Sequence, residues 1–371
     1  MGRDRAGDRP HPGRPHRDAA RQAGRSPADR DGSQHRIPAA LPRRLKATVP
    51  VAQARIPRWR TAIALAILTA IVTACANTGL PAAPRGPVRI ASGSAGGVYA
   101  LYGGALAHLV RQRFPETAAE PIATVGSVEN IELLTAGKAE AGFVLADIAA
   151  DALSGRGAFP GGRPIVALAR LYDNYVQLVV RANGPIRTLA DLAGRRVSIG
   201  AKGSGTAVVS ERVLRLAGLY DDVVLDHQEI SPSARALELG ELDAFFWSGG
   251  LPSEGITGLR ASTAVRLIDL GRVAGRLTRQ YGELYTETTV PASVYGLADE
   301  VGTVSVPNYL VVHRDLPEPV AYWLTRTLFE EQPRLAEVHD EARRLDPGAA
   351  ITTYPLDLHP GAARWYRQQH R

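Results

Sequence analysis

The chain has 371 residues, more than one hydrophobic core of ordinary size supports, so its length predicts two folded domains. The formal charge of +7 comes from the start of the chain, because residues 1–60 hold 15 Lys and Arg against 5 Asp, while residues 61–371 hold 29 basic and 32 acidic residues. The folded part therefore has no excess of basic residues, and we expect no nucleic-acid partner.

The first part of the chain resembles a leader and a signal. Residues 1–58 are rich in Arg, Pro, Gly and Asp without apolar periodicity, which indicates a disordered leader or a misannotated start. Residues 59–75 then join a basic flank, an apolar run and a final Cys75, the layout of a secretory signal. The apolar run is shorter than the about 20 residues that a membrane-spanning helix needs.

The residues before Cys75, Val72-Thr73-Ala74, resemble a bacterial lipobox. We therefore predict lipidation of Cys75, which places the mature protein outside the cytoplasm and anchors it to the cell membrane. The alternative is that Cys75 is only a small residue in an apolar helix. Since Cys75 is the one cysteine of the sequence, an intramolecular disulfide is impossible. Residues 76–87 are interpreted as a tether.

The next elements read as repeated strand–turn–helix units. A strand at 88–91 runs into a glycine-rich turn at 92–97 and a helix from Val98, and a strand at 122–125 runs into a helix that we expect Ser127 to cap. A third strand at 141–146 precedes Asp147, the expected cap of the following helix. Because the ends of parallel strands meet at one edge of a sheet, we expect these turns to face a ligand together.

The middle of the chain repeats this order. Apolar runs at 164–171 and 176–180 predict two strands separated by a turn. The pattern then predicts a strand at 196–199, a glycine loop at 202–206, a helix at 207–217, a strand at 223–225, and a helix with Pro232 at its first position. Residues 134–143 and 237–246 also match as a helix end, a glycine and a buried strand. This internal repeat predicts two similar α/β lobes.

The last part predicts a return to the first lobe. Strands at 303–306 and 309–312 flank an expected hinge turn at Asn308 and Tyr309, and helices follow at 319–330 and 333–344. We therefore predict that one lobe comprises residues 88–172 plus 293–371 and that the other comprises residues 173–292. A ligand cleft would lie between them.

Four motifs together resemble a known family: GSAGGVYALYGGALA, TVGSVENIELLTAGKAEAGFVLAD, DLAGRRVSIGAKGSGT and FFWSGGLP. They are similar to the TAXI family of solute receptors of tripartite ATP-independent (TRAP) transporters, over nearly all of residues 88–345. The resemblance implies a two-lobed periplasmic-binding-protein fold of type II, with mixed sheets flanked by helices. It also implies lobe closure on glutamate, glutamine or a dicarboxylate, and a membrane permease as partner.

The resemblance and the residue pattern give the candidate ligand-binding residues. The expected roles are amides and hydroxyls that hold a carboxylate, a Tyr99 ring that covers it, an Asp147 that accepts from an amino group or caps its helix, and a Trp247 that lines the cleft or packs. Ala100 and Leu145-Ala146 replace more polar residues of the family, which predicts a less polar pocket. The candidates are Gly96, Gly97, Tyr99, Ser127, Asn130, Asp147, Ser204, Gly205, Thr206, Trp247, Gly249 and Gly250.

No catalytic or cofactor motif accompanies these residues. The sequence has no G-x-S-x-G elbow, no P-loop and no G-x-G-x-x-G, and its nine His residues have no metal-ligand spacing. We therefore expect a binding protein without cofactor or metal, and not an enzyme. Two alternatives stay open: a substrate-binding lipoprotein that serves an ABC permease or a sensor, and a two-lobed enzyme.

Overall fold

The computed structural model describes residues 79–369. The predicted leader, the signal, Cys75 and the first residues of the tether lie outside the described residues. Among the helices that are described, none is both long and apolar enough to cross a membrane.

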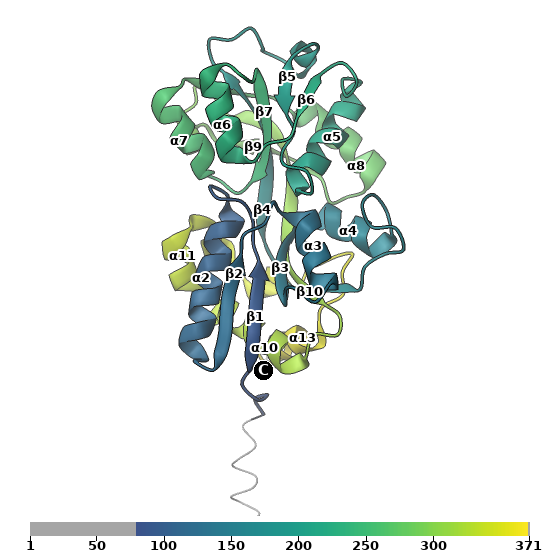
Figure 1. Ribbon diagram of the computed structural model, residues 1–371, viewed down its shortest axis with the longest axis vertical. Helices are drawn as coiled ribbons and strands as arrows, with labels where there is room; N and C mark the ends of the chain where they lie inside the picture. The colour runs from purple at the N-terminus through teal and green to yellow at the C-terminus, as the bar shows by residue number, and fades with distance from the viewer. Residues whose placement is uncertain (1–78, 370–371) are drawn as a thin grey trace, which may run out of the picture. The chain divides into compact units, whose positions relative to one another are not determined.

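The described chain is built on one mixed β-sheet (Figure 1). Eight strands follow the order β2-β1-β3-β10-β4-β7-β5-β6, β8 pairs with β4, and β9 pairs with β10. The strands are β1 (Gly86–Ala91), β2 (Thr117–Ile122), β3 (Ala141–Leu145), β4 (Ile165–Arg181), β5 (Arg196–Ser198), β6 (Val224–Asp226), β7 (Ala244–Gly249), β8 (Val265–Ile268), β9 (Thr286–Val290) and β10 (Val301–His313).

Two long strands divide this sheet into halves. β1 pairs in parallel with β2 and β3, and we call these three strands the first half-sheet. β5 pairs in parallel with β6 and β7, and we call these three the second half-sheet. β4 and β10 run antiparallel to each other and pair with β7 and β3 respectively, so they connect the two half-sheets (Figure 1).

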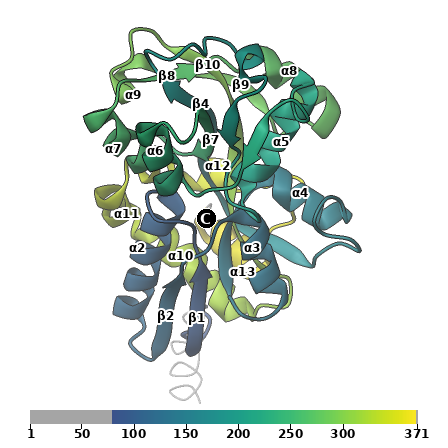
Figure 2. The ribbon, with the colours of Figure 1, turned by 45° about the horizontal axis from the view of Figure 1, so that its top comes forward.

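Helices cover both faces of the sheet. Near the first half-sheet, α2 and α3 lie on opposite sides, as α6 and α5 do near the second (Figure 2). The α-helices are α2 (Val98–Arg113), α3 (Ser127–Thr135), α4 (Ala146–Ser154), α5 (Gly205–Ala217), α6 (Ile230–Leu239), α7 (Glu254–Ser262), α8 (Gly271–Tyr281), α9 (Ala292–Tyr295), α10 (Glu318–Glu330), α11 (Gln332–Val338), α12 (Pro347–Ala350) and α13 (Pro360–Gln369). Short 3₁₀ turns are η1 (Leu189–Leu192) and η2 (Asp340–Arg344).

Three apolar clusters fill the space between the helices and the sheet. On one face, a single cluster joins α3 and α4 to α5 and α8, and therefore spans both half-sheets. On the other face, α2, α10 and α13 cover the first half-sheet, while α6 and α7 cover the second with a separate cluster. Successive side chains of β7 point to the two faces of the sheet, because Phe245 lies on the α6–α7 side and Phe246 on the α5–α8 side. We call these the shared face and the split face.

The two predicted breaks in the long strands are absent, which corrects the sequence prediction. β4 continues through the expected turn at 172–175, because Asn174 pairs with Val306 and Tyr175 pairs with Gly249. β10 likewise continues through Asn308, and only a β-bulge between Pro307 and Tyr309 marks the expected hinge turn. Polar side chains can remain in a strand here because other strands supply their hydrogen-bond partners.

Other boundaries also differ. The strand expected at 122–125 is β2, which ends at Ile122, because the Val125 amide instead donates to the Glu129 carboxylate at 2.7 Å. Pro232 is the third residue of α6 and not the first. The helix expected at 333–344 stops at His339, whose extended backbone separates α11 from η2.

The sheet confirms the predicted fold class, a mixed α/β architecture flanked by helices. The predicted border between residues 172 and 173 falls inside β4. The predicted lobe limits remain a prediction.

Candidate ligand-binding site

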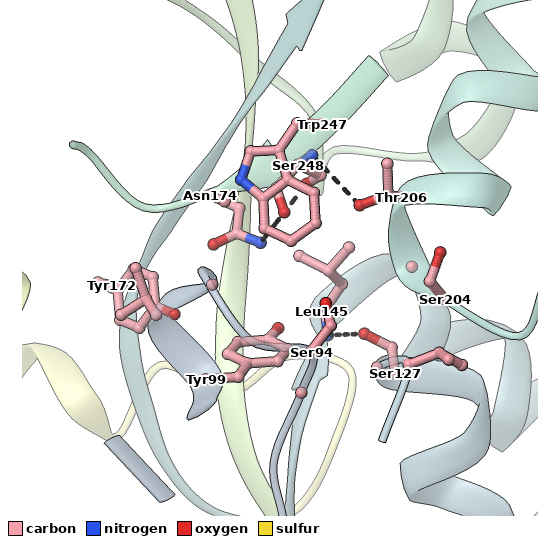
Figure 3. Close-up of a pocket in the computed structure, with 17 residues that line it drawn as sticks. Ser94, Tyr99, Ser127, Leu145, Tyr172, Asn174, Ser204, Thr206, Trp247 and Ser248 are labelled. Carbon is pink, nitrogen blue, oxygen red and sulfur yellow. Dashed lines mark hydrogen bonds between the residues drawn. The ribbon is translucent and has the colours of Figure 1, made fainter. Parts of the chain in front are cut away.

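A cavity of about 40 Å³ lies where helices of the two half-sheets meet (Figure 3). Its walls come from the start of α2, the start of α3 and the end of β3, from the middle of β4, and from the start of α5 and the end of β7. No lining side chain is charged. The lining residues are Gly93, Ser94, Gly97, Val98, Tyr99, Val125, Gly126, Ser127, Leu145, Tyr172, Asn174, Ser204, Gly205, Thr206, Trp247, Ser248 and Gly249.

Three helices begin at this cavity. The first residues of α2, α3 and α5 are Val98, Ser127 and Gly205, and all three line it. The first amides of a helix have no partner inside the helix, and the helix dipole makes this end partly positive. The residue directly before each of these helices is glycine or serine, namely Gly97, Gly126 and Ser204.

The backbone amides at the starts of these three helices differ in whether they have hydrogen-bond partners within the protein. At the start of α3, the amides of Val128 and Glu129 donate to the Gly203 carbonyl at 3.1 and 3.2 Å. Within the described chain, the amides of Val98 and Tyr99 in α2 make no hydrogen bond. The α5 amides of Gly205 and Thr206 likewise have no partner among residues 79–369. The cavity therefore meets unpaired donors from both half-sheets.

Most hydroxyl and amide side chains at the cavity also hold the walls in place (Figure 3). The Ser127 hydroxyl accepts from the Leu145 amide at 3.1 Å, and the Thr206 hydroxyl accepts from the Ser248 amide at 3.2 Å. Ser204 is the N-cap of α5, because its hydroxyl accepts from the Ala207 amide at 3.0 Å. In these three bonds the hydroxyl oxygen accepts, so none of the bonds uses the hydroxyl proton.

Three aromatic side chains complete the walls. Tyr99 stacks on Phe143 with ring centroids 5.4 Å apart, and its hydroxyl donates to the Asn308 side chain. Trp247 donates from its indole nitrogen to the Ser253 hydroxyl at 2.9 Å. Tyr172 is 3% exposed, and its hydroxyl has no partner in the described chain. In Figure 3 this hydroxyl points from β4 toward Tyr99.

Burial keeps both cavity tyrosines protonated. Desolvation raises the pKa of Tyr99 and raises the pKa of Tyr172 well above the ordinary value of 10.0. A phenol that stays neutral is a hydrogen-bond donor at every physiological pH. The cavity thus offers donors and no fixed negative charge.

The structure brings most of the sequence candidates to this cavity. Ligand contact by them remains a prediction. The candidates that line it are Gly97, Tyr99, Ser127, Ser204, Gly205, Thr206, Trp247 and Gly249, and those that do not are Gly96, Asn130, Asp147 and Gly250.

Asn130 is buried behind the cavity wall. Its side-chain amide donates to the carbonyls of Ser92 and Phe143, both at 2.7 Å, and its oxygen accepts from Thr124 at 2.6 Å. These bonds tie α3 to the ends of β1 and β3. Asn130 therefore positions the first half-sheet under the cavity.

Asp147 takes part in a buried ionic cluster on the shared face. Its carboxylate lies 2.9 Å from the Arg212 guanidinium of α5 and accepts from the Tyr285 hydroxyl. Arg212 also pairs with Asp151 of α4 and donates to Tyr285 at 2.8 Å. Burial raises the pKa of Asp147, and the adjacent Arg212 opposes this shift.

Two predicted helix caps are corrected at the same time. Leu145 and not Asp147 is the N-cap of α4, because Asp147 is the second residue of that helix and faces Arg212. Gly126 and not Ser127 is the N-cap of α3, because the Ser127 hydroxyl is engaged with Leu145.

The remaining two candidates are glycines in tight contacts. A Cβ on Gly96 would lie 3.1 Å from the Ser231 hydroxyl of α6, and a Cβ on Gly250 would lie 3.0 Å from the Tyr172 ring. Gly96 also has a φ of 87°, which favours glycine. Both positions demand a small residue for packing reasons.

Sequence reasoning missed Tyr172, Asn174 and Ser248. A signal was present, because the four polar residues at 172–175 interrupt an otherwise apolar strand. We interpreted that interruption as a turn, whereas it is the point at which β4 passes the cavity. Within the described residues, no group of His, Cys, Asp and Glu could hold a metal ion.

The chain belongs to the NMT1-like family, whose profile matches residues 90–369. The match covers most of the chain and nearly all of the part that the structure describes. The fold is of the periplasmic-binding-protein type II class, as the sequence predicted.

Several solved structures are similar to the chain at low identity. The periplasmic aliphatic sulphonate binding protein SsuA from Escherichia coli has 19% identity and a TM-score of 0.43, over 78% of this chain and 84% of that one. The periplasmic binding protein BugD has 15% identity and a TM-score of 0.48, over 77% and 94%. A putative L-cystine ABC transporter from Listeria monocytogenes has 14% identity and a TM-score of 0.41, over 69% and 94%.

These findings correct the resemblance inferred from the motifs. The family whose profile matches the chain is the NMT1-like family. The identification as a TAXI receptor of a TRAP transporter was therefore wrong. Glycine is the usual residue wherever a tight turn leads into a helix, so the motifs were less specific than they appeared in isolation.

Proposed function

We propose that the chain is an extracytoplasmic solute-binding protein that captures a small anionic solute in the cavity. The observation that carries the proposal is the set of unpaired amides at the starts of α2 and α5, which face one space from opposite half-sheets. A ligand that binds both sets of donors holds the half-sheets together. Helix N-termini are suited to carboxylates and other small anions.

The lining favours binding over catalysis. It contains no His, Asp, Glu, Lys, Arg or Cys, so it has no general base and no activated nucleophile. Its serines accept hydrogen bonds from backbone amides or cap a helix, which are positioning roles. The enzyme alternative therefore has no chemical support in this cavity.

For the partner, we propose the permease of an ABC-type transporter, one of the two partners, with a sensor, that stayed open beside the TRAP permease. We further propose that lipidation of Cys75 anchors the protein to the membrane. A neighbouring gene for an ATPase would support the ABC assignment, and a neighbouring gene for a sensor kinase would contradict it. A Cys75→Ala variant that stays in the membrane fraction would contradict lipid anchoring.

A thermal-shift panel on the full chain tests the binding function. It contains short carboxylates, dicarboxylates, 2-oxo acids, amino acids and sulfonates. A ligand at 100 times its Kd stabilises the folded state by about 2.7 kcal/mol, which raises the Tm by roughly 5 °C in a chain of this size. If no solute shifts the Tm at millimolar concentration, the proposal fails.

Site variants locate the binding. Ser127→Ala removes a lining hydroxyl. We expect it to weaken binding of the ligand found in the panel, while the circular dichroism spectrum stays that of the native protein. Ser210→Ala is the matched control, because Ser210 is also buried and lies in α5, but its hydroxyl donates to the Thr206 carbonyl and does not line the cavity. Equal affinities of the two variants would show that the ligand binds elsewhere.

A further inference from the structure

We propose that the cavity selects small carboxylates without an ammonium group, in particular 2-oxo acids of three or four carbons, over the α-amino acids of the same size. This inference rests on the proposed function and names its substrate class. It follows from four features of the described cavity: its hydrogen-bond donors, the absence of acidic side chains from its lining, the hydroxyl of Tyr172, and its size.

Backbone amides at the starts of α2 and α5 can bind the same carboxylate of a ligand. Unpaired amides of Val98 and Tyr99 lie at the start of α2, and those of Gly205 and Thr206 lie at the start of α5. A carboxylate has about four lone-pair positions and can accept from both sets at once. The positive ends of three helices stabilise its negative charge without a basic side chain.

The same helix ends disfavour an ammonium group. An ammonium that leaves water needs a carboxylate or several strong acceptors, and no lining side chain is acidic. The nearest candidate from the sequence was Asp147, but its oxygens are occupied by Arg212, Tyr285 and the Ile148 amide. An amino acid would therefore bring an unpaired positive charge toward three positive helix ends.

Tyr172 supplies the observation that is independent of the helices. Tyr172 belongs to the cavity lining, and its buried hydroxyl has no partner in the described chain. A buried hydroxyl without a partner is unfavourable, so it indicates a group that a ligand completes. An oxygen on the carbon beside the carboxylate can accept from this hydroxyl, whereas an ammonium at that position has no lone pair.

Size and apolar lining limit the rest of the ligand. The cavity of about 40 Å³ is small, which suits a short ligand better than a long one. Its remaining surface includes Val98, Leu145 and the Trp247 ring, which suits a methyl or ethyl group. A long dicarboxylate would place its second charge against this apolar wall.

Isothermal titration of the full chain with isosteric pairs tests the selection. Pyruvate is compared with L-alanine, and 2-oxobutyrate with L-2-aminobutyrate, because each pair differs only at the carbon beside the carboxylate. We expect the 2-oxo acid to bind at least about 100-fold more tightly in each pair, since an unpaired buried charge is strongly unfavourable. An amino acid that binds as tightly as its partner overturns the inference while the proposed function stands.

Tyr172→Phe tests the role of the hydroxyl. We expect 2-oxo acid binding to weaken about tenfold, the effect of one lost hydrogen bond to a bound ligand, while the Tm without ligand does not fall. Tyr354→Phe is the matched control, because Tyr354 is 78% exposed and remote from the lining. Unchanged affinity of Tyr172→Phe overturns this step.

These experiments distinguish a wrong substrate class from a wrong proposed function. If neither member of a pair binds but another solute of the thermal-shift panel does, the substrate class is wrong and the binding function stands. If no solute of the panel binds, the proposed function itself fails.

Discussion

The two half-sheets meet at two contacts of opposite character. On the shared face, Asp147 and Asp151 of α4 meet Arg212 of α5 in a buried ionic cluster, and a continuous apolar core surrounds them. On the split face, the turn that contains Gly96 meets α6, where the Ser231 hydroxyl donates to the Ala95 carbonyl at 3.4 Å. Figure 2 shows α2 beneath α6 on one side and α3 and α4 beneath α5 on the other.

The two regions differ in whether they contain charged side chains that are paired with each other. In the ionic cluster every charge has a charged partner inside the protein, so the cluster needs nothing from outside. At the cavity there are small residues, neutral hydroxyls and unpaired amides, so a charge must come from the ligand. We therefore expect the shared face to stay joined during function and the split face to separate.

The largest effect should follow from breaking the ionic cluster. Arg212→Met leaves Asp147 and Asp151 buried without a cation, since the Arg212 side chain is only 11% exposed. Loss of one partner of such a cluster is expected to lower the free energy of unfolding by about 3–5 kcal/mol, measured by urea denaturation. Arg272→Met on the exposed side of α8 is the control and should leave the midpoint unchanged. An Arg212→Met variant as stable as the control would show that the cluster contributes no stability.

A smaller effect should follow from crowding the contact beside the cavity. A Cβ on Gly205 would lie 2.5 Å from a Leu145 methyl carbon and 2.8 Å from the Ser127 hydroxyl, both on the first half-sheet. We expect Gly205→Ala to lower the free energy of unfolding by about 1–3 kcal/mol, because the half-sheets must move apart to make room.

A second helical glycine controls for helix propensity. Gly104 lies inside α2, and a Cβ there would have no atom within 4 Å. Gly104→Ala should raise the free energy of unfolding by about 0.4–1 kcal/mol. If both glycine variants behave alike, the contact at Gly205 is looser than the structure shows.

Much of the fold could be predicted because local patterns determine it. Glycine turns, apolar runs and helix caps located α2, α5, β3 and β7 to within a few residues. The long strands could not be predicted, because the residues that keep 172–175 in β4 lie on β7 and β10, far away in the sequence. A polar interruption looks like a turn until its cross-strand partners are known.

The site was predictable to the extent that it is made of backbone. Glycine and serine before a helix identify amides that a ligand can reach, and these positions line the cavity. The side chains were less predictable. Asp147 had the right type and position for a ligand contact, but Arg212 is 65 residues away in sequence and takes its charge. Sequence alone does not show which of two buried partners a carboxylate will choose.

On the split face, removal of a contact should have almost no effect. Ser231 is exposed, and its bond to the Ala95 carbonyl is long at 3.4 Å. Ser231→Ala should therefore change the free energy of unfolding by less than about 0.5 kcal/mol in urea denaturation. A loss comparable to that of Arg212→Met would show that the split face is as firmly joined as the shared face, and would contradict the comparison.

The absence of titratable charge at the cavity predicts flat pH dependence of binding. Ionisation of Tyr99 or Tyr172 would remove a donor and repel an anion, so affinity would fall as pH rises through their pKa values. Because burial raises the pKa of both above the ordinary 10.0, that fall lies above the physiological range. The affinity for pyruvate, which is fully ionised above pH 5, should therefore change less than about twofold between pH 6 and 9 by calorimetry. A fall centred between pH 6 and 8 would mean that a titrating group such as a histidine contacts the ligand, and would place the binding site outside the neutral cavity.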